Sequence, residues 1–243
     1  MSEQTAIETV GAIVAADFRA AAVFQRFGID FCCSGRRSLT EACHTAAADP
    51  EEVMRALGEL PIRPVSNAND VTQWSVDRLI DHIVATHHAY VLSAIPTIGG
   101  YLKKLSDVHG ERHPELLQVA AYFDQIGADL EQHLVKEEQV LFPYLRDLAE
   151  NAEQTCGAML NPFGTVANPI RMMEREHHEV AEGLCLIRLL THGYAAPADG
   201  CTTYAVCMRE LERFEQDLHR HVHLENNVLF PKALELEGQD SYL

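Results

Sequence analysis

The chain has 243 residues, of which 36 are acidic and 19 are lysine or arginine, so the net charge is −17 with histidine neutral. This length allows a core that needs no cross-links. The negative charge argues against nucleic acid and anionic membranes as partners, because both attract basic surfaces. No apolar run approaches the roughly 18 residues of a membrane span, and Met1–Phe18 lacks the basic and apolar regions of a secretion signal. We therefore expect a cytoplasmic protein without membrane partners.

Seven cysteines are present. An odd number of cysteines without a secretion signal argues against a disulfide framework and predicts reduced thiols. Four of them are expected to be ordinary helix or loop residues, namely Cys156, Cys185, Cys201 and Cys207.

The first part of the chain predicts a small helical domain over residues 1–60. An amphipathic pattern without proline predicts a helix over 5–27, which ends at a glycine. Ser38 or Thr40 can cap the next helix, and Pro50 takes the first turn of another.

Residues 61–74 hold two prolines and several turn-forming residues, so we expect a linker there. Beyond the linker, the pattern contains no alternation typical of a strand and predicts four long helices over 75–106, 114–150, 166–194 and 202–236. The chain is therefore expected to be all-α, with an up-down-up-down four-helix bundle over residues 75–238.

Two segments of the predicted bundle are near copies of each other, His133–Pro143 and His221–Pro231. Each begins with a histidine and a glutamate at positions i and i+4, and both end in Val-Leu-Phe-Pro. On a helix this spacing places both side chains on one face, and the apolar residues indicate that this part of the helix is packed. One such pair is common by chance in an acidic helical protein, but two copies favour a metal site.

A histidine also lies about 45 positions upstream of each copy, at His88 and His177, and each has a second histidine beside it, His87 and His178. Two helix pairs would then bring four imidazoles and two carboxylates together in the bundle core. Such a set suits two metal ions bridged by the carboxylates. Nitrogen and oxygen donors without thiolate favour iron or manganese over structural zinc.

The first helix contains His82, His87 and His88, and the pattern alone does not decide between them. Neighbouring residues on a helix point in different directions, so only one of His87 and His88 can be a ligand of this site. The other histidines are expected to be exposed or to form hydrogen bonds around the site: His109, His113, His192, His219 and His223.

Nearly the whole chain resembles the repair-of-iron-centres family of di-iron proteins, of YtfE, ScdA or DnrN type, which carry a hemerythrin-like domain. Five segments carry the resemblance: Asp30–Cys33, Lys136–Pro143, Glu176–His177, Cys201–Thr203 and Leu224–Pro231. One departure is Ser34, where the family commonly has glycine; we expect only the turn to change.

The resemblance implies a ligand set and places His88 in it. The implied metal ligands are His88, His133, Glu137, His177, His221 and Glu225. It implies a cofactor of two non-haem iron ions, bridged by carboxylates and by an oxo group when oxidised. It also implies that His109 is a candidate near-site residue. Glu138, one residue round the helix from Glu137, is expected to matter little.

Cys32 and Cys33 are adjacent in the small domain, and the basic pair Arg36 and Arg37 follows them. Nearby positive charge favours thiolate, so reactive thiols are one interpretation. The other is one buried and one exposed structural cysteine. The resemblance favours a relay role in handling iron, nitric oxide or disulfide exchange.

The leading functional hypothesis is a protein that restores iron–sulfur clusters damaged by nitric oxide or oxidants, by donating iron or handling nitric oxide. Its partners would be damaged iron–sulfur proteins and nitric oxide, and its oligomeric state stays open, a homodimer included. Two alternatives use the same site: a binding module that carries or senses dioxygen or nitric oxide, and an enzyme that reduces nitric oxide to nitrous oxide.

Overall fold

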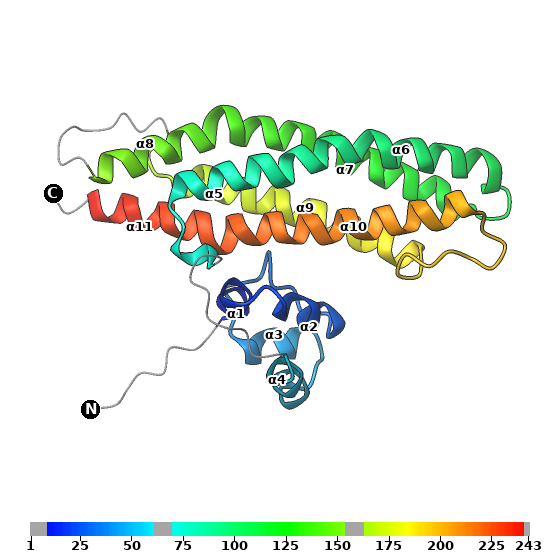
Figure 1. Ribbon diagram of the computed structural model, residues 1–243, viewed down its shortest axis with the longest axis horizontal. Helices are drawn as coiled ribbons and strands as arrows, with labels where there is room; N and C mark the ends of the chain where they lie inside the picture. The colour runs from blue at the N-terminus through cyan, green and yellow to red at the C-terminus, as the bar shows by residue number, and fades with distance from the viewer. Residues whose placement is uncertain (1–8, 61–69, 154–162, 241–243) are drawn as a thin grey trace. The chain divides into compact units, whose positions relative to one another are not determined.

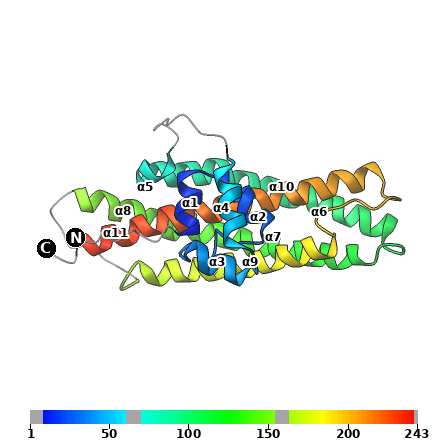
Figure 2. The same ribbon diagram turned by 90° about the horizontal axis from the view of Figure 1, so that it is seen from below.

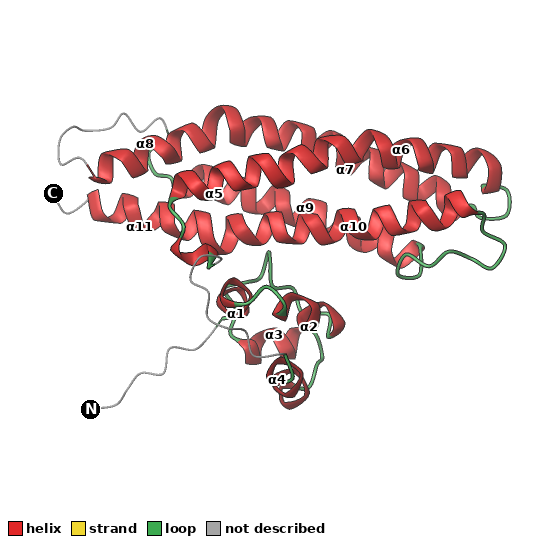
Figure 3. Cartoon of the chain, in the orientation of Figure 1, coloured by secondary structure: helices red, strands yellow, loops and turns green. Residues whose placement is uncertain are grey.

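The computed structural model describes residues 9–60, 70–153 and 163–240. The chain divides into two compact units, Met1–Leu79 together with Val222–Leu243, and Ile80–His221. Within the described ranges every regular element is helical, apart from a single strand-type bridge between Thr9 and Ser38 (Figure 3). The predicted all-α class is confirmed. The linker expected at 61–74 lies mostly outside the described residues, so its boundaries stay a prediction, and Cys156 also lies outside them.

The first unit begins with two short helices, α1 (Val10–Ala16) and α2 (Ala20–Arg26). The prediction of one continuous helix here is wrong, because the chain is extended at Asp17, with φ −147° and ψ 102°. The Asp17 carboxylate accepts hydrogen bonds from the backbone N–H of Arg19, at 3.1 Å, and from its guanidinium group. Aspartate often competes with the helix in this way, by bonding nearby backbone groups.

Two further helices follow, α3 (Leu39–Thr45) and α4 (Pro50–Gly58), and both begin where their caps predict. Ser38 and Glu41 form a reciprocal capping box: the Glu41 N–H donates to Ser38 Oγ and the Ser38 N–H donates to the Glu41 carboxylate. At α4, Asp49 accepts from the N–H of Glu51 at 2.9 Å, and Pro50 stands in the first turn.

Asn227, from the last helix of the chain, also belongs to the first unit and fixes the loop that carries the double cysteine. Its side-chain amide donates to the carbonyl oxygen of Cys32 at 3.0 Å and lies 3.3 Å from that of Phe31. The backbone approaches so closely that a Cβ atom on Gly35 would lie 1.9 Å from Asn227 Oδ1, and one on Gly11 would lie 2.5 Å away. Both positions therefore need glycine.

Four long helical segments follow the short helices in the sequence, and Figures 1 and 2 show them running back and forth side by side. They lie within a few residues of the four predicted helices. In chain order they are α5 (Val76–His82), η3 (Ile83–His88) and α6 (Ala89–His109); α7 (Glu115–Lys136), η4 (Glu137–Leu141) and α8 (Phe142–Glu153); α9 (Ala167–Leu190); and α10 (Thr202–Leu224), η5 (Glu225–Leu229) and α11 (Phe230–Asp240). Segments η3, η4 and η5 are π-helical, which the sequence does not predict.

Small residues allow close packing between the bundle helices. A Cβ atom on Gly127 of α7 would lie 3.0 Å from Ile95 of α6, and one on Gly183 of α9 would lie 2.9 Å from Ile126 of α7. The buried apolar residues of α6 recur every three or four positions: Val91, Ala94, Ile98, Leu102 and Leu105. This tight core holds the helices in a fixed register and so fixes the side chains that they contribute to the bundle centre.

In the described part of the chain, no helix is both long and apolar enough to cross a membrane.

Candidate metal centre

Each π-helical segment of the bundle has a candidate ligand at one end. His88 is the last residue of η3, Glu137 is the first of η4, and Glu225 is the first of η5. A π turn is a wider and less stable form of the helix, and such turns occur frequently at functional sites. The bundle therefore departs from α-helical geometry where the candidate ligands lie.

The structure brings all six predicted ligands together. They form two groups, His88, Glu137, His221 and Glu225, and His133, Glu137, His177 and Glu225. Within each group the ligand atoms all lie within 4.8 Å of one another, and every member is buried. Both groups contain both carboxylates, so the arrangement has two centres that share Glu137 and Glu225.

The four imidazoles form two pairs. The Nε2 atoms of His88 and His221 are 3.2 Å apart, and those of His133 and His177 are 3.0 Å apart. Within each pair the rings meet edge to face.

Glu137 lies between the two imidazole pairs. Its Oε2 atom is 3.4 Å from Nε2 of His88, and its Oε1 atom is 3.3 Å from Nε2 of His133. One carboxylate oxygen is therefore turned toward each pair. This is the geometry that a carboxylate adopts when it bridges two cations.

Two carboxylates from outside the six-residue cluster, those of Glu138 and Glu176, contact two of the imidazoles on the ring nitrogen that faces away from the cluster. His88 Nδ1 lies 2.8 Å from Oε1 of Glu138, and His133 Nδ1 lies 2.8 Å from Oε2 of Glu176. A carboxylate that accepts from one ring nitrogen orients the ring and leaves the other nitrogen with its lone pair free for a metal. This contact places Glu138 next to a candidate ligand, which the sequence did not predict, so we now expect Glu138 to affect metal binding.

Glu176 has a second partner, because the ammonium group of Lys136 also donates to it. Burial raises the pKa of the Glu176 carboxyl, but the hydrogen bonds from Lys136 and His133 lower it by more, so the net pKa lies below its ordinary value. Glu176 is thus held ionised behind His133.

His87 belongs to neither group of candidate ligands, in agreement with the choice of His88. It is buried, its Nδ1 lies 3.1 Å from the Asp217 carboxylate, and its ring stacks on His221 at 5.9 Å. His87 therefore supports the ring of a candidate ligand, which is one of the two roles expected for it.

The donor set fits a two-metal centre. Four imidazole nitrogens and two shared carboxylates suit iron or manganese, and no cysteine belongs to either group. Glu137 and Glu225 are both fully buried. Buried carboxylates cost several kcal/mol unless positive charge or hydrogen bonds compensate them, and divalent cations would supply that charge.

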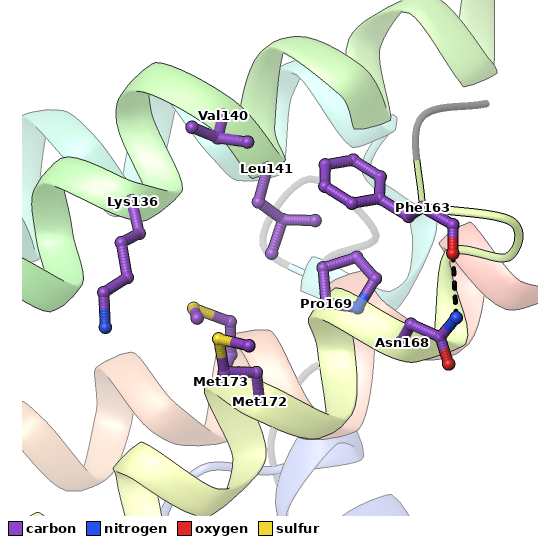
Figure 4. Close-up of a pocket in the computed structure, with 8 residues that line it drawn as sticks. All are labelled: Lys136, Val140, Leu141, Phe163, Asn168, Pro169, Met172 and Met173. Carbon is purple, nitrogen blue, oxygen red and sulfur yellow. Dashed lines mark hydrogen bonds between the residues drawn. The ribbon is translucent and has the colours of Figure 1, made fainter. Parts of the chain in front are cut away.

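The bundle also has an apolar pocket, whose lining residues Figure 4 shows. Its volume is about 260 Å³, and its lining residues come from η4, the end of α7, the start of α9 and the turn before α9: Lys136, Val140, Leu141, Phe163, Asn168, Pro169, Met172 and Met173. Leu141 is one turn beyond Glu137, and Met173 is one turn before His177. The pocket wall therefore lies next to two members of the cluster.

His109, the candidate near-site residue, lies at the far end of α6 from His88. At 1.5 Å per residue the two are about 30 Å apart, too far for a shared metal. His109 is buried and its Nε2 lies 3.3 Å from the Cys201 sulfur.

Two further residues differ from what the sequence predicts. His223 is not exposed: it packs against the rings of Phe18 and Phe31, its Nδ1 lies 3.2 Å from the side-chain amide of Asn227, and burial lowers its pKa to about 4. Cys201 is not an ordinary loop cysteine, because it pairs with His109. A local sequence pattern cannot reveal a partner 92 residues away.

The double cysteine lies in the first unit. The sulfur atoms of Cys32 and Cys33 are 3.9 Å apart, and Cys32 is buried while Cys33 is half-buried. The neighbouring Cys33 thiol and burial raise the pKa of Cys32 well above its ordinary value. The pKa of Cys32 is therefore shifted away from the thiolate that nearby positive charge would favour, and Arg37 donates its hydrogen bond to Thr45 instead.

A buried cluster of histidines and glutamates at the centre of a four-helix bundle defines a hemerythrin-type metal-binding domain. The model of the hemerythrin HHE cation binding domain matches residues 79–233, and that of the ScdA_N domain, a domain of unknown function, matches residues 6–61.

Three named proteins are similar to this chain over most of their length. A probable iron-sulfur cluster repair protein of Haemophilus influenzae is 32% identical over 87% of this chain and 90% of its own. The iron-sulfur cluster repair protein YtfE of Dickeya chrysanthemi is 33% identical over 89% and 91%, and that of Musicola paradisiaca is 32% identical over 95% and 98%. The chain therefore belongs to the family of iron–sulfur cluster repair proteins with an N-terminal ScdA_N domain and a hemerythrin domain.

Proposed function

We propose that this chain holds two carboxylate-bridged iron ions and takes part in the repair of damaged iron–sulfur clusters. The observation that supports the two-ion site best is the position of Glu137, with one oxygen turned toward each imidazole pair. The names of the relatives support repair as the purpose of the site. The partners would then be damaged iron–sulfur proteins.

Two bound irons would offer open coordination positions to a small ligand. They would also be a source of iron for a damaged cluster. The chain's own residues would set how firmly the ions are held. Glu138 and Glu176 hold the rings of His88 and His133 in the orientation that turns Nε2 inward. The shared carboxylates Glu137 and Glu225 would keep the two positions linked.

For Cys32 and Cys33 we propose a relay role that does not include binding the bundle irons. Their two sulfurs are adjacent, and Asn226 and Asn227 both contact the Cys32 carbonyl oxygen. These asparagines directly follow Glu225 in the sequence. The segment that supplies a candidate ligand thus also fixes the backbone of the double cysteine.

A second candidate function is the binding or reduction of nitric oxide at the same centre. The apolar pocket favours it, because a small apolar molecule can occupy a pocket lined by leucine, proline, methionine and phenylalanine next to the cluster (Figure 4). This function would place nitric oxide among the ligands of the protein and link it to nitrosative stress.

The test is to load the pure chain with iron and add it to an enzyme whose [4Fe–4S] cluster has been damaged by nitric oxide, with nitrous oxide measured in parallel. Recovery of the enzyme's activity above that given by the same amount of free iron supports repair. Nitrous oxide production without recovery would favour the second candidate. If the loaded chain neither restores the enzyme nor produces nitrous oxide beyond the free-iron control, both candidate functions are refuted.

A further inference from the structure

A cysteine and a histidine meet at the end of the bundle where α6 stops and α10 begins (Figure 1). His109 is the last residue of α6, and Cys201 comes directly before Thr202, the first residue of α10. The Nε2 atom of His109 lies 3.3 Å from the sulfur of Cys201. The imidazole is 5% exposed, whereas Cys201 is on the surface.

The two loops that carry this pair are fastened to each other. Asp199, just before Cys201, accepts from Arg112 at 3.0 Å and contacts Nε2 of His113 at 3.0 Å. The rings of His109, His113 and Tyr204 pack edge to face, with centroids 5.7 to 6.4 Å apart. The imidazole therefore cannot swing away from the sulfur without loosening this packing.

The proton of the imidazole can be placed on the nitrogen that faces the sulfur. His109 Nδ1 is buried, and it has no hydrogen-bond partner among the residues that the structure describes. A proton on Nδ1 would be a buried donor without an acceptor, which costs about 1–3 kcal/mol. The favoured form carries the proton on Nε2, where it donates to the Cys201 sulfur.

The surroundings stabilise the ionised sulfur. The hydrogen bond from His109, followed by the backbone N–H groups of Tyr204 and Thr203 at the start of α10, lowers the pKa of Cys201 to about 7. The charged and titratable groups around the pair are Arg112, His113, Glu115, Asp199 and Tyr204. By contrast, burial raises the pKa of Cys207, six residues further along α10, to about 12.

We propose that Cys201 is a modification site at which a hydroperoxide oxidises the thiolate beside His109 to a sulfenic acid. The sulfur attacks one peroxide oxygen, so that a sulfur–oxygen bond forms as the oxygen–oxygen bond breaks. The sulfur loses two electrons and the peroxide gains them. The departing alkoxide, or hydroxide when the oxidant is hydrogen peroxide, takes a proton from solvent to give an alcohol or water. The site lies about 30 Å along α6 from His88 and is separate from the metal centre.

The first experiment measures the alkylation rate of Cys201 by iodoacetamide against pH, read by mass spectrometry of the peptides. Cys185 on α9 is exposed in the same chain and serves as the internal control. At pH 7 a thiol with a pKa of about 7 is roughly half ionised, against a few per cent for an ordinary one. Because nucleophilicity falls with pKa, we expect Cys201 to react about five- to tenfold faster than Cys185. Its rate should have a midpoint near pH 7.

Two further arms make the assignment specific. In His109→Gln, the midpoint of Cys201 should rise above pH 8 while the rate at Cys185 stays the same. With hydrogen peroxide at pH 7 and dimedone as the trap, the sulfenic adduct should form at Cys201 well before Cys185. Equal alkylation of the two cysteines in the unaltered chain would overturn the proposal even if His109→Gln fails to fold. Fast alkylation without the dimedone adduct would overturn its oxidative step.

Discussion

The Nδ1 atom of His133 lies 2.8 Å from the Glu176 carboxylate, and this contact turns the opposite nitrogen of the ring toward His177. His88 has the same arrangement with Glu138. One ring of each imidazole pair is thus held by a carboxylate from outside the cluster. Such contacts commonly decide how tightly a histidine site binds its metal.

Glu176→Gln and Glu138→Gln should each weaken metal binding about 10- to 100-fold, because the amide is a poorer acceptor and no longer fixes the ring. Competition with a chelator of known affinity measures the change. Glu131→Gln is the matched control, since Glu131 is exposed on α7, the helix that carries His133. If all three variants bind metal alike, the outer carboxylates do not support the site.

Glu137→Ala should abolish binding of the paired metals while leaving the metal-free fold intact. Removing a fully buried carboxylate relieves the metal-free chain of a desolvated charge, so its melting temperature should stay the same or rise. The increase in melting temperature that metal gives the unaltered chain should disappear. A variant that still gains stability from two metals per chain would contradict a bridging role for Glu137.

The double variant Cys32→Ser/Cys33→Ser should keep the absorption spectrum of its iron centre but restore damaged clusters poorly. The six-residue cluster already provides a complete nitrogen and oxygen donor set, and neither cysteine belongs to it. Cys185→Ser, at an exposed position, is the control. If the double variant loses its bundle iron, the cysteines belong to the metal site. If it keeps full repair activity, the cysteines have a structural role only.

Gly35→Ala should destabilise the first unit by about 1–3 kcal/mol, because the new methyl group would overlap Asn227 and the Phe31 carbonyl oxygen. Urea unfolding followed by circular dichroism measures this. Gly58→Ala is the control, because a Cβ atom there meets nothing within 4 Å. Equal stability of the two variants would mean that the loop can move away from Asn227 at little cost.

The histidine and glutamate of each repeated motif could be predicted because their spacing is local and occurs twice. Their convergence follows once the helices are antiparallel. The π-helical turns could not be predicted, because one wider turn changes the spacing of the apolar residues too little to be recognised in the sequence. The contact of Glu138 with His88 could not be predicted either, because it joins two helices through residues 50 positions apart in the sequence. The break at Asp17 and the pair formed by Cys201 and His109 depend on contacts that no periodic pattern records.

The proposed site, in which six side chains hold two irons through shared carboxylates, is tested most directly by metal analysis. The chain is reconstituted anaerobically with ferrous iron, and loose metal is removed before the iron is counted. We expect two irons per chain in the unaltered protein and in Glu131→Gln, and fewer than one in Glu137→Ala. A single zinc and no iron per chain, or iron that stays at two per chain in Glu137→Ala, would contradict the proposed site.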